Sequence, residues 1–444
     1  MGSASARALV DEPLPRLVRR FALPAVASNL LMTLFGSVDA YWVGTRVGPE
    51  GLAAVSTAVF WVWLVIAVAE MVSIGLTAIA ARRHGEGSAE AAARTAGEAL
   101  GFSILLGSAI AVVGHLLLPS LFAVMGTPPA VTALGLRYLG TYLLAAPLLF
   151  GYFAVDATFR AAGDTRTPLL LLTTSVLLTL ALDPVLILGL GPAPRLGIAG
   201  AAVATVGVRS VAFLIGLVLL ARRGLLRPRM PHWRTMWAIS RIGLPTAMTG
   251  VMFSLIYVAM TRTTTRFGTP ALAALGLGHR VESWLYMIGV GFGAAAAAIV
   301  GQNLGAGRPE RAMRAGWLLT ACATIPALGG FALVTLYPER VAALFTTDAA
   351  VIAETARYLR IASLAQLFVC AELVLEGAMG GAGDTVPPML SSASLTLIRV
   401  PLVAWSAARW GTSGIWWVIS LTAVARGIAM MALWRLGRWQ RKSV

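Results

Sequence analysis

The chain has 444 residues, of which 58% are hydrophobic and only 12% are charged. Soluble domains carry about 25% charged residues, whereas apolar segments of about 20 residues, the length that spans hydrocarbon as a helix, recur along this whole chain. The composition therefore excludes a soluble protein and predicts an all-α integral membrane protein. The net charge of +16 does not indicate nucleic-acid binding, because the basic residues form no clustered face on a soluble module.

Twelve spans are predicted, and both ends of the chain are expected in the cytoplasm. Arginine and lysine number 22 in the two termini and the even-numbered loops but only 9 in the odd-numbered loops, and short cytoplasmic segments carry such an excess. We expect a multi-pass protein of the plasma (inner) membrane without a removable signal peptide. The spans run over 21–45, 51–81, 97–122, 131–159, 168–190, 198–221, 236–261, 270–301, 313–337, 350–380, 389–408 and 412–434.

An internal repeat organises these spans. The segment Gly163-Asp164-Thr165 returns as Gly383-Asp384-Thr385, 220 residues later. Each copy holds six spans, so the two copies enter the membrane from the same side and are predicted to be related by a pseudo-two-fold axis along the membrane normal. The expected parts are an N-terminal lobe over 1–221, a cytoplasmic linker over 222–235 and a C-terminal lobe over 236–444.

The repeated motif and the linker both have structural interpretations. Glycine followed by Asp, Thr and then Pro ends one helix and starts another, so tight cytoplasmic turns are expected at both copies rather than active sites. The basic linker is expected to be solvated, and binding of anionic lipid headgroups is the alternative. Cys322 and Cys370 lie in apolar segments without metal-ligand spacing, so no disulfide, metal or cofactor is expected.

Acidic residues inside the spans are the strongest functional signal, because an ionisable group at mid-membrane costs about 2.5 to 3.5 kcal/mol. Asp39 and Asp183 occupy comparable depths of spans 1 and 5, which both run outward. Thr179 lies one helical turn before Asp183, and Thr205 lies in span 6. Removal from water disfavours a charged carboxylate, and two neighbouring carboxylates can share a proton near neutral pH; added oxygen ligands would instead suit sodium. These four residues are the predicted cation-coupling site; a structural hydrogen bond is the alternative for Asp39, and a helix kink beside Pro184 is the alternative for Asp183.

A second group of charged residues could line a cavity or relay protons. Two of them, Asp156 and Glu376, lie near the inner interface, where capping of the turns is the alternative. For Glu70 and Glu372 the alternative is pairing with an arginine, and helical spacing directs Arg280 and Glu282 to different faces. The group is Glu70, Asp156, Arg280, Glu282, Glu372 and Glu376.

The chain resembles the multidrug and toxic compound extrusion family of secondary transporters over essentially its whole length. The resemblance rests on Leu23-Pro24 with Asp39 beyond, on Phe159 to Pro168, on Leu182-Asp183-Pro184, on Gly197 to Thr205 and on Val300 to Gly307. It implies two six-helix lobes around a central cleft that export bulky, often cationic compounds in exchange for protons or sodium.

The resemblance also implies functions for particular residues. The family's first-lobe cation site corresponds to Asp39, Asp183 and Thr205, and Thr179 stands where the family usually has asparagine. The span 7 glutamate of the sodium-coupled branch is absent from 248–255. The chain is therefore more similar to the DNA-damage-inducible F branch, for which proton coupling through the span 1 aspartate is the common proposal.

The sequence hypothesis is a monomeric proton antiporter for small amphipathic or cationic molecules, with Pro24 as a hinge in span 1 because its missing N–H weakens the helix there. Sodium-coupled efflux and a flippase for a lipid-linked precursor are the alternatives. A membrane enzyme is not expected, because no nucleophile and base occur at one depth. A scaffold would leave the matched buried acids unexplained.

Overall fold

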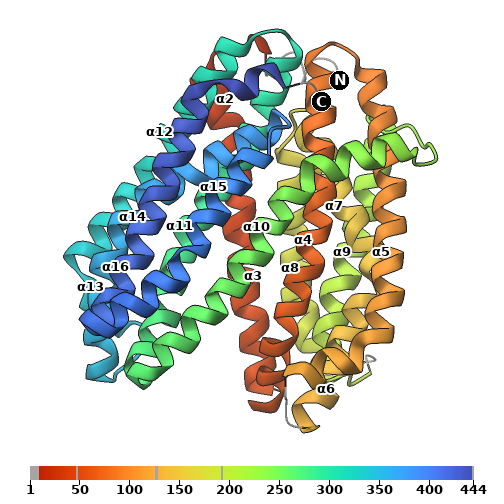
Figure 1. The fold of residues 1–444 in the computed structure, drawn as a ribbon. Helices are drawn as coiled ribbons and strands as arrows, with labels where there is room; N and C mark the ends of the chain where they lie inside the picture. Colours follow the sequence, from red (N-terminus) through yellow and green to blue (C-terminus); the bar gives the residue numbers. More distant parts are fainter. Residues whose placement is uncertain (1–9, 47–48, 126–128, 192–193, 443–444) are drawn as a thin grey trace. The chain divides into compact units, whose positions relative to one another are not determined.

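Helices account for the regular structure of the described part of the chain. A computed structural model describes the backbone of residues 10–46, 49–125, 129–191 and 194–442, and the side chains of most of them. Within these ranges nine helices are long and apolar enough to cross a membrane, or ten when one bent pair counts as a single span. The predicted all-α membrane fold is confirmed, and each of the twelve predicted spans is helical, spans 4 and 11 as two helices each (Figure 1).

The helices of the first repeat follow the predicted spans with one break. Pro147 lies just beyond this break; it lacks an N–H, and in a continuous helix its ring would clash with the carbonyl four residues earlier, so span 4 is divided into two helices that meet at 52°. The elements are α2 (Leu14–Leu17), η1 (Val18–Ala22), α3 (Leu23–Arg46), α4 (Pro49–Gly85), α5 (Ala89–Met125), α6 (Pro129–Leu144), α7 (Ala146–Ala161), α8 (Arg166–Leu188) and α9 (Ile198–Arg222).

The second repeat has its break in span 11. The first part of this span is α15, and α16 continues through span 12 with a non-helical kink at Gly411, where φ is 59° and ψ is −143°. The short helix α13, between spans 9 and 10, is an addition that hydropathy did not predict. The elements are α10 (Trp233–Thr264), η2 (Thr265–Phe267), α11 (Thr269–Gly305), α12 (Pro309–Leu336), α13 (Pro338–Ala343), α14 (Ala349–Gly381), α15 (Val386–Leu397), α16 (Arg399–Leu436) and η3 (Arg438–Arg441).

The chain forms two compact units whose limits differ from the expected lobes. Among the described residues, the first lies within Leu30–Leu244, and the second lies within 10–29 and 245–442. The linker and the first turns of α10 thus belong to the first unit, and the first turns of α3 belong to the second.

The linker belongs to the first unit because it packs along α5. The N–H of Arg227 donates to the carbonyl of Ala93 at 3.0 Å, and a Cβ on Gly97 would lie only 1.9 Å from the carbonyl oxygen of Arg227. Linker arginines also pair with carboxylates: Arg223 with Asp164 at 2.6 Å, Arg227 with Glu90 at 2.5 Å and Arg229 with Glu98 at 3.6 Å. Part of the basic charge expected to be solvated is therefore neutralised by the lobe itself.

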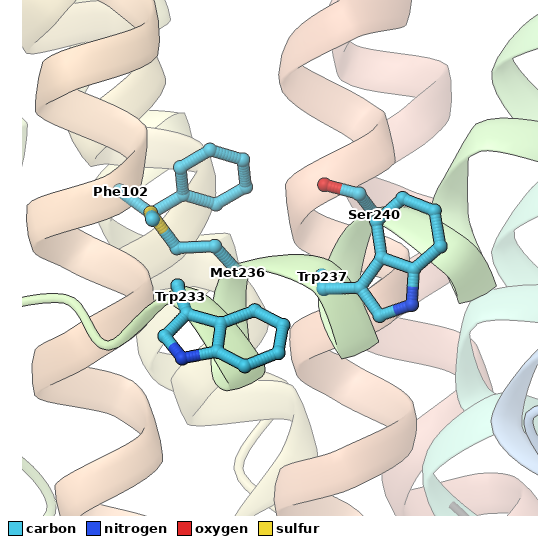
Figure 2. Close-up of a pocket in the computed structure, with 5 residues that line it drawn as sticks. All are labelled: Phe102, Trp233, Met236, Trp237 and Ser240. Atoms are coloured by element: carbon cyan, nitrogen blue, oxygen red, sulfur yellow. The ribbon is translucent and has the colours of Figure 1, made fainter.

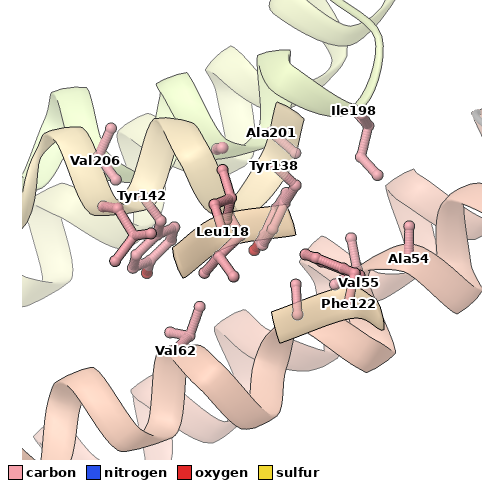
Figure 3. Packing of buried hydrophobic residues seen from close by; sticks show 14 of the residues in the cluster. Ala54, Val55, Val62, Leu118, Phe122, Tyr138, Tyr142, Ile198, Ala201 and Val206 are labelled. Atoms are coloured by element: carbon pink, nitrogen blue, oxygen red, sulfur yellow. The ribbon is translucent and has the colours of Figure 1, made fainter. Parts of the chain in front are cut away.

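Each unit has its own apolar core. In the first, α4, α5, α6 and α9 enclose side chains such as Val62, Phe122 and Tyr138 (Figure 3). In the second, Tyr358 and Trp416 pack edge to face, with ring centroids 4.9 Å apart. These cores hold the helices that carry the charged residues described next.

Candidate functional site

The two repeated motifs form turns, as predicted. Gly163 and Gly383 have φ values of 79° and 80°, a region open to glycine because it has no Cβ. In the first turn, Asp164 Oδ1 accepts hydrogen bonds from the N–H groups of Arg166 and Thr167, both at 3.0 Å. The carboxylate thus binds the free N–H groups at the start of α8.

Part of the predicted coupling set is buried on α8 and α9. Asp183 is completely buried, and Thr179 and Thr205 are 3% and 4% exposed. The Thr179 hydroxyl donates to the carbonyl of Ser175 at 2.8 Å, a local bond that satisfies its proton and leaves its oxygen able to accept.

The packing of α8 against α9 brings Asp183 and Thr205 to one level. A Cβ on Gly200 would lie 2.6 Å from the carbonyl oxygen of Leu186, so the two backbones touch there. From that contact Thr205 is five residues along α9, about 7.5 Å, and Asp183 is three residues back along α8, about 4.5 Å. The helices are antiparallel, so both residues lie on the same side of the contact and about 3 Å apart in depth.

The depth of position 39 follows from the packing of α3. Met32 packs against the buried pair Leu172 and Val176 of α8. Spans 1 and 5 run in the same direction. Position 39 lies seven residues beyond Met32 in span 1, and Asp183 lies seven residues beyond Val176 in span 5. Seven residues are about two helical turns, or roughly 10.5 Å. Residue 39 therefore falls at the depth of Asp183, although the side chain of Asp39 lies outside the described part of the chain.

The other two predicted acids of the first unit, Glu70 and Asp156, interact with Arg160. The Asp156 carboxylate forms an ion pair with Arg160, one turn further along α7, and Arg160 also donates to the Ser73 hydroxyl at 3.3 Å. The charge of Arg160 acts on Glu70 of α4 as well, and the Glu70 side chain is exposed. For Asp156, the structure thus shows an ion pair, which was not one of the two roles considered from the sequence.

In the second unit Glu372 is neutralised by an arginine. It is 4% exposed, lies 3.3 Å from Arg426 and accepts a hydrogen bond from Ser392 at 2.8 Å. Arg426 donates in turn to Thr396 at 3.1 Å. Glu376, one turn along α14 from Glu372, lies within the field of the same pair. The alternative of pairing with an arginine therefore holds for Glu372.

Arg280 and Glu282 point to different surroundings, as expected. Arg280 is exposed, whereas Glu282 is partly buried beside Tyr358 and Gln366 and lies 3.6 Å from a ring nitrogen of His279.

The partners of these acids were not in the predicted set. Arg160, Arg399 and Arg426 are the buried or partly buried cations that act on them. A usable sequence signal existed for the second unit, since Ser392, Thr396 and Arg399 follow at spacings of four and three residues, which a continuous helix would place on one face. Hydropathy alone does not say which acid such a face meets.

The first unit also carries an open groove of about 350 Å³ (Figure 2). Phe102 of α5 and Trp233, Met236, Trp237 and Ser240 of α10 line it. Both tryptophans are more than 60% exposed. Aromatic rings with this exposure suit the flat faces of amphipathic compounds or the interface of a membrane.

Comparison with known proteins agrees with this architecture. The MatE family model matches residues 24–185 and again 245–405. A probable multidrug resistance protein NorM of Thermotoga maritima is 29% identical, with 96% of this chain and 93% of that protein covered. A FAD transporter of Shewanella oneidensis is 27% identical, with coverages of 95% and 94%.

A solved structure shares the fold. It is a MOP superfamily transporter from Pyrococcus furiosus, described as having a binding pocket of reversed polarity. The TM-score is 0.90 with 22% identity, and 98% of each chain is covered. The two matches of the family model repeat at the spacing found in the sequence and together cover most of the chain. The protein therefore belongs to the MatE family of multidrug efflux transporters and is not an enzyme.

Proposed function

We propose that the protein is an antiporter that exports bulky cationic or amphipathic compounds in exchange for protons, with Asp39, Asp183, Thr179 and Thr205 as the coupling site. This is the chemistry proposed for the DNA-damage-inducible F branch, to which the motifs are most similar. Sodium coupling and a lipid-linked precursor as substrate are the alternatives to be tested.

The observation that carries the proposal is the complete burial of Asp183, with Thr205 near its depth and residue 39 level with it. A buried carboxylate is costly when charged, and two carboxylates at one depth favour a shared proton. Binding or loss of that proton changes the charge of the pocket, which can favour one conformation of the lobe over another.

Conformational change is proposed to begin at the start of α3. A π-helical turn over Val18–Ala22 immediately precedes Leu23 and Pro24. A π-turn and a proline both interrupt the regular hydrogen bonds of a helix. The chain can therefore bend there while losing few further backbone hydrogen bonds. Pro24 remains the proposed hinge.

The substrate is proposed to enter from the cytoplasmic leaflet. The groove of Figure 2 lies beside the basic linker, which the positive-inside bias assigns to the cytoplasm. Its aromatic lining could hold flat apolar cations, and the multidrug names of several relatives agree with this class. Because one relative is a FAD transporter, flavin nucleotides are a second substrate to assay.

The coupling site can be tested with Asp39→Asn and Asp183→Asn in proteoliposomes carrying a pH gradient. One pH unit can sustain about tenfold accumulation of a monovalent cationic substrate through one-for-one exchange. We expect this accumulation to disappear in both variants, because neither amide can release a proton. The matched control is Asp11→Asn, which removes an exposed carboxylate paired with Arg308 and should leave accumulation unchanged.

The outcomes separate the alternatives. Full proton-driven accumulation by Asp39→Asn at normal protein levels would contradict the assignment. Loss of transport on removing sodium at a fixed pH gradient would favour sodium coupling. Flux of a lipid-linked precursor, with no flux of cationic dyes, would favour the flippase.

A further inference from the structure

The second repeat contains a counterpart of the proposed coupling site, and its position can be found residue by residue. Leu23-Pro24 corresponds to Leu244-Pro245, an offset of 221 residues, and the two glycine turns are 220 apart. With these offsets Asp39 corresponds to Met260, Thr179 to Arg399 and Asp183 to Val403. Both acids are thus replaced by apolar residues, and one hydroxyl is replaced by a guanidinium.

The counterpart of Thr205 follows from a shared backbone contact. Gly197 and Gly411 adopt nearly the same conformation, with φ of 57° and 59° and ψ of −132° and −143°. Each is followed three residues later by a second glycine that touches the preceding span. A Cβ on Gly200 would lie 2.6 Å from the carbonyl oxygen of Leu186, and a Cβ on Gly414 would lie 2.5 Å from that of Ser406. The offset in this span is therefore 214, and Thr205 corresponds to Ile419.

Three of these four counterparts line one cavity in the second unit. It has a volume of about 10 Å³, room for a single water-sized particle, and its walls come from α10, α11 and α16. The lining residues are Phe253, Ile256, Tyr257, Met260, His279, Arg399 and Ile419. At the place that corresponds to the proposed coupling site, the second repeat therefore has a basic residue, Arg399, and no counterpart of the two acids.

Arg399 has no short-range counter-ion in the described chain. It is 5% exposed, and its guanidinium donates to the Thr422 hydroxyl at 2.9 Å and to the Ile419 carbonyl at 3.4 Å. No carboxylate among the described residues lies within 4.0 Å of it. The carboxylates that act on it from farther away, Glu282 and Glu372, lie nearer to His279 and Arg426. A buried charge is costly without a close partner.

We propose that this cavity binds a small monatomic anion, chloride, against Arg399. The guanidinium supplies the charge, Tyr257 and His279 add an O–H and a ring N–H to the lining, and Met260 and Ile256 complete an apolar wall. A volume near that of one water-sized particle suits a monatomic anion better than sulfate, phosphate or a carboxylic acid. This inference concerns binding to the second lobe and does not depend on which ion drives transport.

The first test locates the anion in the purified wild-type protein. Crystals grown in sodium bromide should show an anomalous difference peak beside the Arg399 guanidinium, enclosed by Tyr257 and His279. A site occupied only by water, with no bromide peak at a concentration that saturates the thermal effect below, would overturn the proposal.

The second test measures thermal stability in detergent at equal ionic strength. Chloride and bromide should raise the melting temperature of the wild type by roughly 2 °C relative to gluconate. Arg399→Gln should lose this rise, and Arg399→Lys should keep part of it. The matched control Arg409→Gln, which removes an exposed arginine stacked on Trp405 of the same helix, should keep it fully.

The site would be contradicted if chloride raised the melting temperature of Arg399→Gln as much as that of the wild type. It would also be contradicted if the wild type melted at the same temperature in gluconate as in chloride. Because neither test measures transport, failure of the proposed coupling site leaves these results unaffected. If Arg399→Gln does not fold, the bromide peak and the Arg399→Lys comparison still decide the matter.

Discussion

At the scale of single residues, Asp164 links the stability of the first lobe to pH. Burial alone would raise the pKa of this carboxyl, but hydrogen bonds from the Thr167 side chain and backbone and the pairing with Arg223 outweigh burial and lower its pKa. A group whose pKa is lowered by folding stabilises the folded state above its unfolded pKa, about 3.9 for aspartate. That contribution is lost as the pH falls from there through the folded pKa.

We therefore expect Asp164→Asn to be less stable than the wild type at pH 6, by about 1 kcal/mol, and the difference to shrink as the pH falls from 4 toward 3. Melting temperatures in detergent over this range measure it. Arg223→Gln is a useful comparison, because it removes one partner and leaves the Thr167 bonds, so part of the pH dependence should remain. A constant gap between pH 6 and pH 3 would contradict the role of the Asp164 charge.

At the scale of elements, α11 and α14 approach each other through small residues. A Cβ on Gly377 would lie 2.4 Å from the carbonyl oxygen of Gly293, and a Cβ on Gly381 would lie 2.1 Å from that of Ala297. Gly377 and Gly381 are four residues apart on α14, and Gly293 and Ala297 are four residues apart on α11. This spacing of small residues lets membrane helices pack backbone to backbone. This contact holds α14, with Glu372 and Glu376, against α11.

Gly377→Ala should destabilise the second lobe by about 1 to 3 kcal/mol, because the added methyl group must separate two backbones. The measurement is the melting temperature in detergent. The control is Gly329→Ala on α12, where an added Cβ meets nothing within 4 Å; its effect should be neutral or stabilising by up to about 1 kcal/mol. Equal effects of the two substitutions would show that the close approach contributes nothing.

At the scale of the whole molecule, one proton exchanged for one monovalent cation moves no net charge. The voltage contribution of about 2.3 kcal/mol per 100 mV then cancels. Uptake of a monovalent dye into everted vesicles should therefore follow the pH gradient and stay unchanged when valinomycin and potassium impose a membrane potential. A strong response to voltage would mean that more than one proton moves per dye molecule.

Much of the architecture could be predicted from the sequence alone. Apolar segments must span the membrane as helices because backbone groups have no other partners in hydrocarbon, so the twelve spans were readable from hydropathy. The duplication was readable from the spacing of the Gly-Asp-Thr turns. Asp183, Thr179 and Thr205 are buried in the structure, and their function as a coupling set stays a prediction for the transport assay.

Only the tertiary structure decided which charges meet. Arg426 faces Glu372 from a helix 54 residues further along the chain, and Arg227 pairs with Glu90 across 137 residues. Hydropathy and helical spacing show which residues share the face of one helix. Ion pairing between two helices depends on how both helices are rotated and how deep each lies. For the same reason the sequence could align Asp39 with Met260 but could not reveal that Met260, Arg399 and Ile419 line one cavity.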